Sequence, residues 1–115
     1  MDIMSLTAVE IGKRIKSGEI SVREAVEAAL AQIDRVEADV HSYVTIDSEG
    51  ARKRADEVQK LIDDGTLTGP LAGVPVAIKD NMCTEGMLTT CSSKILENFQ
   101  PPFTAEAVKN MEEAG

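Results

Sequence analysis

The sequence predicts an α/β fold, and three observations lead to that prediction. Two segments begin with the residue pattern of a helix capping box, at Thr7–Glu10 and at Ser21–Glu24. Two short runs rich in β-branched residues, Tyr43–Ile46 and Val74–Lys79, predict strands, and a helical pattern separates them. A strand, a helix and a strand in this order predict a right-handed crossover, with the strands parallel and paired directly or across another strand.

The helical N-terminus, about residues 1–40, predicts two helices. The first begins at the Thr7 capping box and should end near Gly18. The second begins at the Ser21 box, and its apolar residues recur at helical spacing. Each cap contributes on the order of 1 kcal/mol, so burial of the apolar seams must supply most of the remaining stability. The predicted seam of the second helix is Val22, Val26, Ala29, Ile33 and Val36.

The next segment, about residues 42–81, predicts a βαβ unit. Its helix should occupy about Glu49–Asp64, with Gly65 after its end. Pro75 lies within the second strand and has no N–H group, so one ladder position there must be unpaired or bulged. The apolar face of the predicted helix consists of Ala51, Ala55, Val58 and Ile62.

The last segment, about residues 82–115, predicts a loop followed by a helix. Small polar residues between Thr84 and Ser93 are typical of a loop that borders a site. A short helical turn at about 94–97 follows, and Thr104 is the predicted cap of a last helix that ends at Ala114. Because two strands offer little sheet to cover these helices, we expect an N-terminal piece of a larger α/β protein, whose unpaired edges drive self-association.

Composition excludes several classes of function. A net charge of −8 argues against the isolated chain binding nucleic-acid phosphates, and the basic clusters at 13–16 and 52–54 lie among acidic neighbours. Cys83 and Cys91 form neither a disulfide framework nor a metal set, which indicates a reducing, cytoplasmic compartment. His41, the only histidine, is expected to border a turn. No run reaches the ~20 apolar residues of a membrane span, and the N-terminus is not a signal peptide.

Lys79 is the most informative single residue. It ends an apolar run, where an amine can lose contact with water, and a lowered pKa would then suit it to act as a general base. An ordinary strand-end lysine with its amine in solvent fits the same spacing. The glycines before it, Gly69 and Gly73, are not followed by the Gly-Lys pair of a phosphate-binding loop, so ATP is not an expected ligand.

Three residues after Lys79 are candidates for a nucleophile. Ser92 or Ser93 could form a Ser–Lys pair with Lys79, which needs no histidine. Segments rich in serine and threonine more often satisfy backbone groups, and no glycine-rich elbow surrounds these serines. Cys91 has no marked basic partner and is by default a small buried hydrophobe. The residues therefore leave the nucleophile unassigned.

Two runs of residues carry a resemblance to a known family. They are GVPVAIKDN at 73–81 and TTCSSKILENF at 89–99, with Gly86 between them. These runs closely resemble the amidase signature family, and within it the A subunits of the glutamyl-tRNA(Gln) amidotransferases. The opening residues 6–24 are similar to those subunits as well, so the resemblance covers essentially the whole chain.

The resemblance implies that residues 1–115 form the N-terminal portion of an amidase signature fold, with helices packed on part of a mixed sheet. It implies a Ser–cis-Ser–Lys triad in which Lys79 is the catalytic lysine. Both triad serines and the glutamine-binding residues would follow Gly115, so the isolated chain is expected to be inactive. The chain departs from the family at Ser92, where alanine is usual, and at Thr104, where aspartate is usual. Both departures are interpreted as structural.

The implied activity is that of a glutaminase, which releases ammonia from glutamine to convert Glu-tRNA(Gln) to Gln-tRNA(Gln). The implied partners are the B and C subunits of the amidotransferase. No cofactor would be bound by this chain, because ATP and magnesium would be used elsewhere in the complex. The choice between Gln and Asn tRNA would lie in other subunits. Two alternatives remain, namely a fragment of a generic amidase and a non-catalytic helical module in which Lys79 has no role.

Overall fold

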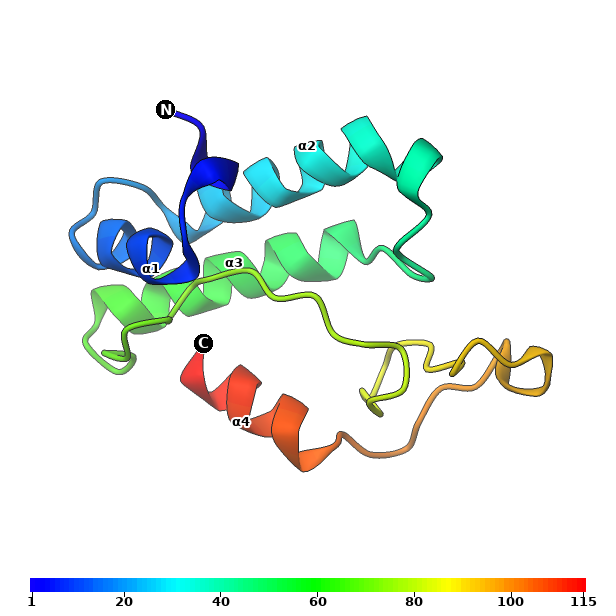
Figure 1. Cartoon of the computed structure of the whole chain (residues 1–115). Coiled ribbons are helices and arrows are strands. Elements are labelled where there is room, and N and C mark those ends of the chain that lie inside the picture. The colour runs from blue at the N-terminus through cyan, green and yellow to red at the C-terminus, as the bar shows by residue number, and fades with distance from the viewer. The chain divides into compact units, whose positions relative to one another are not determined.

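The computed structural model describes all 115 residues, which form two compact units. The helical unit comprises residues 1–75 together with 114–115, and the loop unit comprises residues 76–113. Figure 1 shows the labelled helices along the chain. None of these helices combines the length and the apolar character needed to cross a bilayer.

The helical unit begins with a 3-10 turn, η1 (Ile3–Ser5), and the helix α1 (Ala8–Lys16). The predicted capping box of α1 is confirmed. Glu10 N–H donates to Thr7 Oγ1 at 3.3 Å, and Thr7 N–H donates to the Glu10 carboxylate at 2.8 Å. The helix ends as predicted just before Gly18, whose φ of +74° lies in the left-handed region that glycine adopts without steric cost.

The second predicted capping box begins the helix α2 (Val22–Val40). Glu24 N–H donates to Ser21 Oγ at 3.1 Å, and Ser21 N–H donates to the Glu24 carboxylate at 2.7 Å. His41 ends α2 in a left-handed conformation with a φ of +51°, and its N–H donates to the Glu37 carbonyl at 2.9 Å. His41 therefore borders a turn, as predicted.

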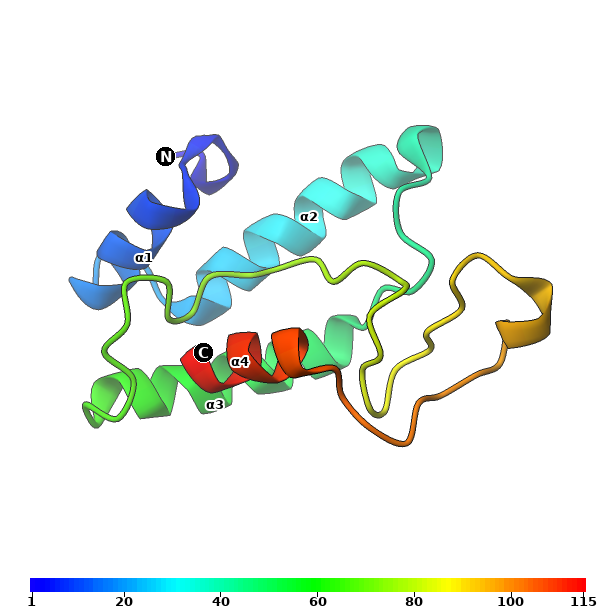
Figure 2. The same cartoon turned by 60° about the horizontal axis from the view of Figure 1, so that its bottom comes forward.

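The third helix, α3 (Ser48–Asp63), begins where Asp47 Oδ1 accepts a hydrogen bond from Gly50 N–H at 2.9 Å. Its bounds match the prediction to within one residue. Helices α2 and α3 run side by side in opposite directions, as the views in Figure 1 and Figure 2 both show. Two helices joined by a short connection bury their apolar faces most directly in this antiparallel arrangement.

The core of the helical unit consists of aliphatic side chains from α1, α2, α3 and the α1–α2 connection. Val22 and Val26 are buried as predicted, but the other three residues of the predicted α2 seam are only half-buried. Ala25 and Leu30 complete the buried face of α2 instead. Each fully buried Val, Leu or Ile contributes roughly 1.5–3 kcal/mol. The buried core residues are Ile11, Ile15, Ile20, Val22, Ala25, Val26, Leu30, Ala55 and Val58.

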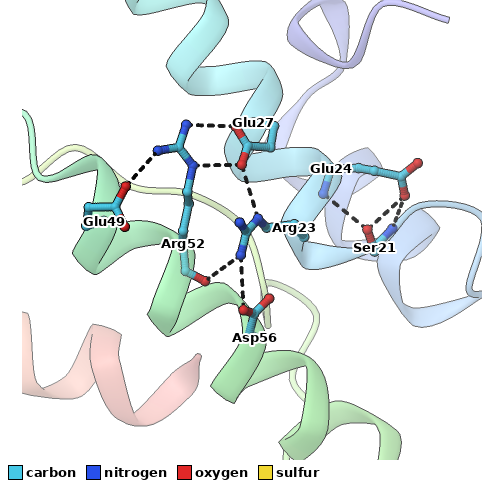
Figure 3. A network of polar contacts seen from close by, with 7 residues as sticks. All are labelled: Ser21, Arg23, Glu24, Glu27, Glu49, Arg52 and Asp56. Atoms are coloured by element: carbon cyan, nitrogen blue, oxygen red, sulfur yellow. Dashed lines mark hydrogen bonds and ion pairs between the residues drawn. The ribbon is translucent and has the colours of Figure 1, made fainter.

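An ion-pair network joins α2 to α3 outside this core (Figure 3). Arg52 donates from Nε and Nη2 to the two oxygens of Glu27 at 2.8 and 3.1 Å, and Glu49 lies 3.3 Å from Arg52 Nη1. Arg23 donates to Glu27 at 3.1 Å and to Asp56 at 3.0 Å. The network orients one helix on the other through directional, bidentate contacts, and its partly exposed members give it a small share of the stability.

The structure contains no β-strand, so the predicted strands at Tyr43–Ile46 and Val74–Lys79 are wrong, and the expected mixed sheet is absent. A strand needs a neighbouring strand to accept and donate its ladder hydrogen bonds. No such neighbour occurs among the 115 residues. Tyr43, Val44 and Ile46 are exposed, and the second run is an irregular segment with Val76 60% exposed.

The loop unit is mostly irregular and contains one 3-10 turn, η2 (Lys94–Leu96), which confirms the predicted turn. The last helix, α4, spans Glu106–Ala114, and Gly115 follows it with a φ of +84°. The predicted cap of α4 is wrong. Thr104 Oγ1 accepts a hydrogen bond from Glu85 N–H at 3.1 Å, so its hydroxyl fastens two loop segments together rather than capping the helix.

We predict that Gly12→Ala destabilises the helical unit. A Cβ atom at position 12 would overlap the Pro70 carbonyl oxygen and lie 3.1 Å from its carbon, and backbone atoms cannot rotate away. We expect the free energy of unfolding to fall by about 1–3 kcal/mol in urea titrations followed by circular dichroism. A Cβ atom at Gly69 would meet no atom within 4 Å, so Gly69→Ala is the control, and equal stability of the two variants would contradict the prediction.

We also predict that stability falls in acid because of the capping boxes. Hydrogen bonds from Thr7 and Ser21 lower the pKa values of Glu10 and Glu24. A carboxyl group whose pKa is lower in the folded state stabilises the fold above its unfolded-state pKa, and this contribution is lost as the pH falls through the folded-state value. The urea concentration at the midpoint of unfolding should therefore stay constant from neutral pH down to the ordinary pKa of glutamate. At lower pH it should decrease.

The control for this prediction is Glu24→Gln, which keeps a capping side chain but removes the titrating group. Its urea midpoint should fall less steeply in acid than that of the unchanged chain. The same slope in both proteins would show that the capping carboxylate at position 24 makes no contribution to the pH dependence.

Candidate active-site lysine and its neighbours

Lys79 lies in the loop unit, at the end of the irregular run that starts at Val76. Its carbonyl oxygen accepts a hydrogen bond from Met82 N–H at 3.0 Å, which closes a turn directly after the lysine. The residue is exposed, because no other segment of the chain covers its long side chain. The desolvation expected of a general base is therefore not provided by the residues of this chain.

The next residue, Asp80, is held on both of its carboxylate oxygens by Thr90. Thr90 N–H donates to Asp80 Oδ1 at 2.8 Å, and the Thr90 hydroxyl donates to Asp80 Oδ2. The Asp80 carbonyl oxygen also accepts a hydrogen bond from Cys91 N–H at 2.9 Å. These three contacts join the end of the lysine run to a loop ten residues further along the chain.

These contacts favour the charged form of Asp80. The hydroxyl of Thr90 and then its backbone N–H lower the pKa of the Asp80 carboxyl group below the ordinary aspartate value, and burial opposes them. Hydrogen bonds to a carboxylate lower its pKa because they stabilise the ionised form. Asp80 is accordingly a fixed negative charge beside Lys79 in the sequence.

The loop that holds Asp80 has a strained backbone. Cys91 and Ser92 have φ values of +50° and +58°, in the left-handed region that residues other than glycine rarely adopt. Such conformations cost roughly 1–3 kcal/mol each and persist only where surrounding contacts determine them. Here Ser92 N–H donates to Thr90 Oγ1 at 3.2 Å, and Ser93 N–H donates to the Thr90 carbonyl at 2.8 Å.

The structure does not bring the candidate nucleophiles into contact with the candidate base. Cys91 and Ser92 are exposed and Ser93 is half-buried, and none of their side chains forms a hydrogen bond with the Lys79 amine. The expectation of a buried Cys91 is wrong, because the residue is exposed at the surface of the loop. His41 lies in the helical unit at the end of α2.

The sequence pattern marks Asp80 only as the polar end of the lysine run and does not predict its partner. The sequence carries no signal that singles out Thr90, because Thr89 and Thr90 lie among several other small polar residues between Thr84 and Ser93. Thr89 and Thr90 are both buried, with 3% and 6% of their surfaces exposed. No group of three or more histidine, cysteine or acidic side chains comes together in a way that could hold a metal ion.

Comparisons with known proteins show which proteins resemble this chain. The family model described as "Amidase" matches residues 24–115. Two similar curated proteins, from Agathobacter rectalis and Lachnospira eligens, are both named as the A subunit of a glutamyl-tRNA(Gln) amidotransferase. They are 67% and 56% identical to this chain over 115 residues, which is the whole chain in both cases. The chain spans 23% and 24% of the lengths of these relatives.

A similar solved structure is described as a vestigial protein complex that reveals the evolutionary origins of an s-triazine catabolic enzyme. It has a TM-score of 0.87 and 33% sequence identity, and the match covers 96% of this chain and 24% of that chain. An inhibitor-bound form of the same complex matches with a TM-score of 0.83.

The resemblance inferred from the two sequence runs is thereby confirmed at the level of the family. The matched region contains Lys79, its neighbour Asp80 and the strained loop, so the features described above lie within the part of the chain that the family shares. Because the family model extends over residues 24–115, this chain belongs to the Amidase family.

Proposed function

We propose that the chain supplies the lysine of a glutaminase centre in a glutamyl-tRNA(Gln) amidotransferase. The observation that carries this proposal is the 67% identity, over all 115 residues, to a curated protein named as the A subunit of that enzyme. Lys79 supports it as the one lysine in the GVPVAIKDN run, next to an aspartate that the fold holds on both oxygens.

In the proposed reaction, Lys79 acts as a general base in its neutral form. Its amine takes a proton through a bridging serine from a second serine, whose oxygen attacks the side-chain amide carbon of glutamine. The C–N bond then breaks, the nitrogen leaves as ammonia with the returned proton, and an acyl-enzyme remains. Water hydrolyses this ester to release glutamate. Both serines would come from residues outside the 115 of this chain, as would the groups that desolvate Lys79.

The proposal also includes partner subunits and a role for each of them. The ammonia would pass to the B subunit, where Glu-tRNA(Gln) is activated with ATP and magnesium and converted to Gln-tRNA(Gln), while the C subunit would clamp the A subunit. The chain itself would bind neither ATP nor magnesium. The 115 residues alone would be inactive, since general-base assistance, worth roughly 10²–10⁴ in rate, needs a nucleophile to act upon.

A second function is favoured by the exposure of Lys79 and by the separate core of the helical unit. In this alternative, α1 and α2 form a docking surface for another protein, and Lys79 has no chemical role. The first proposal needs the Lys79 amine as a base and the second does not, so a substitution at position 79 distinguishes them.

We predict that this chain can replace the matching quarter of the Agathobacter rectalis A subunit in a chimera expressed with its B and C subunits. The chimera should release ammonia from glutamine, and Lys79→Ala should lower kcat by about 10²–10⁴ because the base is lost. Lys94→Ala, which removes another exposed lysine of the loop unit, is the matched control. Activity that survives Lys79→Ala would refute the catalytic proposal and support the docking alternative.

We further predict that a serine-directed fluorophosphonate probe leaves the isolated 115-residue chain unlabelled. Ser92 and Ser93 form no hydrogen bond with the Lys79 amine, so nothing activates their hydroxyl groups as nucleophiles. Intact mass spectrometry would detect the adduct, and the active chimera serves as the positive control. Stoichiometric labelling of the isolated chain at either serine would show that this chain carries its own nucleophile.

A further inference from the structure

Thr90 stands out in the loop unit because it is a polar residue that is almost fully buried, with 6% of its surface exposed, and uses every polar atom it has. Its N–H and hydroxyl both donate to the Asp80 carboxylate, and its hydroxyl oxygen also accepts from Ser92 N–H at 3.2 Å. Its carbonyl accepts from Ser93 N–H at 2.8 Å. A buried side chain with this many directed contacts fixes the backbone on both sides of it.

The contacts of Thr90 reach the backbone of Lys79 through the next residue. Asp80 is joined to Lys79 by a peptide bond, and it is held on its side chain by Thr90 and on its carbonyl by Cys91 N–H at 2.9 Å. The carbonyl of Lys79 is held from the other side by Met82 N–H at 3.0 Å. The backbone at Lys79 is therefore fixed, while its side chain extends into solvent.

The strained residues show that these contacts are strong enough to determine local structure. Cys91 and Ser92 both occupy the left-handed region without being glycine, and they directly follow Thr90. A backbone in this state relaxes unless its neighbours hold it. Here Asp80 and Thr90 supply the hydrogen bonds that hold it, so relaxation of this loop and release of the lysine backbone are linked.

We propose that Asp80 is a positioning residue for Lys79, acting through its paired hydrogen bonds with Thr90. This inference rests on the function proposed above for the lysine. A general base must come within about 2.6–3.2 Å of the proton that it accepts, and a lysine side chain is a flexible four-carbon stem. Holding its Cα atom in place is then the contribution that this chain can make to the geometry of the site.

The first test uses the 115-residue chain and amide hydrogen exchange measured by NMR. Met82 N–H reports on the Lys79 carbonyl that it contacts. Thr90→Val keeps the shape of the side chain but removes the hydroxyl with its two hydrogen bonds, so exchange at Met82 should accelerate about tenfold. Thr90→Ser restores the hydroxyl and should stay within about twofold of the unchanged chain.

The matched control is Thr104→Val, which removes a hydroxyl that accepts one backbone hydrogen bond elsewhere in the loop unit. It should leave exchange at Met82 unchanged. Equal exchange at Met82 in Thr90→Val and Thr104→Val would overturn the proposal. Should Thr90→Val disorder the whole chain, Asp80→Asn provides a milder comparison in the same direction, because it replaces one acceptor oxygen with a donor and removes the negative charge that strengthens both hydrogen bonds with Thr90.

The second test uses the chimera described above and separates kcat from KM. Thr90→Val should lower kcat about tenfold with KM within about twofold, Thr90→Ser should recover most of kcat, and Thr104→Val should match the unchanged chimera. A kcat in Thr90→Val equal to that of Thr104→Val would overturn the positioning role. If Lys79→Ala leaves the activity of the chimera unchanged, the proposed function is refuted instead. The exchange rate of Met82 N–H would still decide whether Asp80 and Thr90 hold the lysine backbone.

Discussion

The packing of α2 against α3 and α1 is the interaction on which the helical unit depends. With aromatic residues making up only 3% of the chain, the core is assembled from aliphatic side chains that must fit closely to exclude water. Close fit demands glycine where segments touch. Gly12 meets the backbone at Pro70, and a Cβ atom on Gly73 would lie 2.7 Å from a methyl carbon of Val22. The core thus fixes Gly73, the residue that opens the GVPVAIKDN run.

The loop unit achieves its order by different means. Outside η2 and α4 it is irregular, and most of its hydrogen bonds join backbone groups to one another, with further ones from the side chains of threonine and aspartate. Asp80 and Thr90 are the centre of this arrangement, because their contacts hold two left-handed residues in place and fasten the end of the lysine run. Directional hydrogen bonds suit this task better than apolar burial, since they fix orientation as well as distance.

The exposure of Lys79 agrees with a lysine whose chemical environment is completed by other residues. A neutral amine requires removal from water or a nearby positive charge, and the loop unit does not cover this side chain. What the chain does offer is a fixed backbone, an ionised aspartate in the adjoining position and family membership over residues 24–115. The proposed glutaminase role assigns the missing desolvation to residues other than those that surround Lys79 in this structure.

The sequence by itself determined the features that depend on neighbouring residues: both capping boxes, the ends of α1 and α3, the turn at His41 and the family. These succeed because a cap or a helical period involves residues within a few positions of one another. Only the tertiary structure decided the features that need distant partners. The runs at 43–46 and 74–79 have strand-like composition but no neighbour to pair with, Leu30 rather than Ala29 faces the core, and Asp80 meets Thr90 ten residues away. The composition of a segment indicates which secondary structure it can form. Strand pairing and side-chain burial depend on which other segments lie beside it in the folded chain.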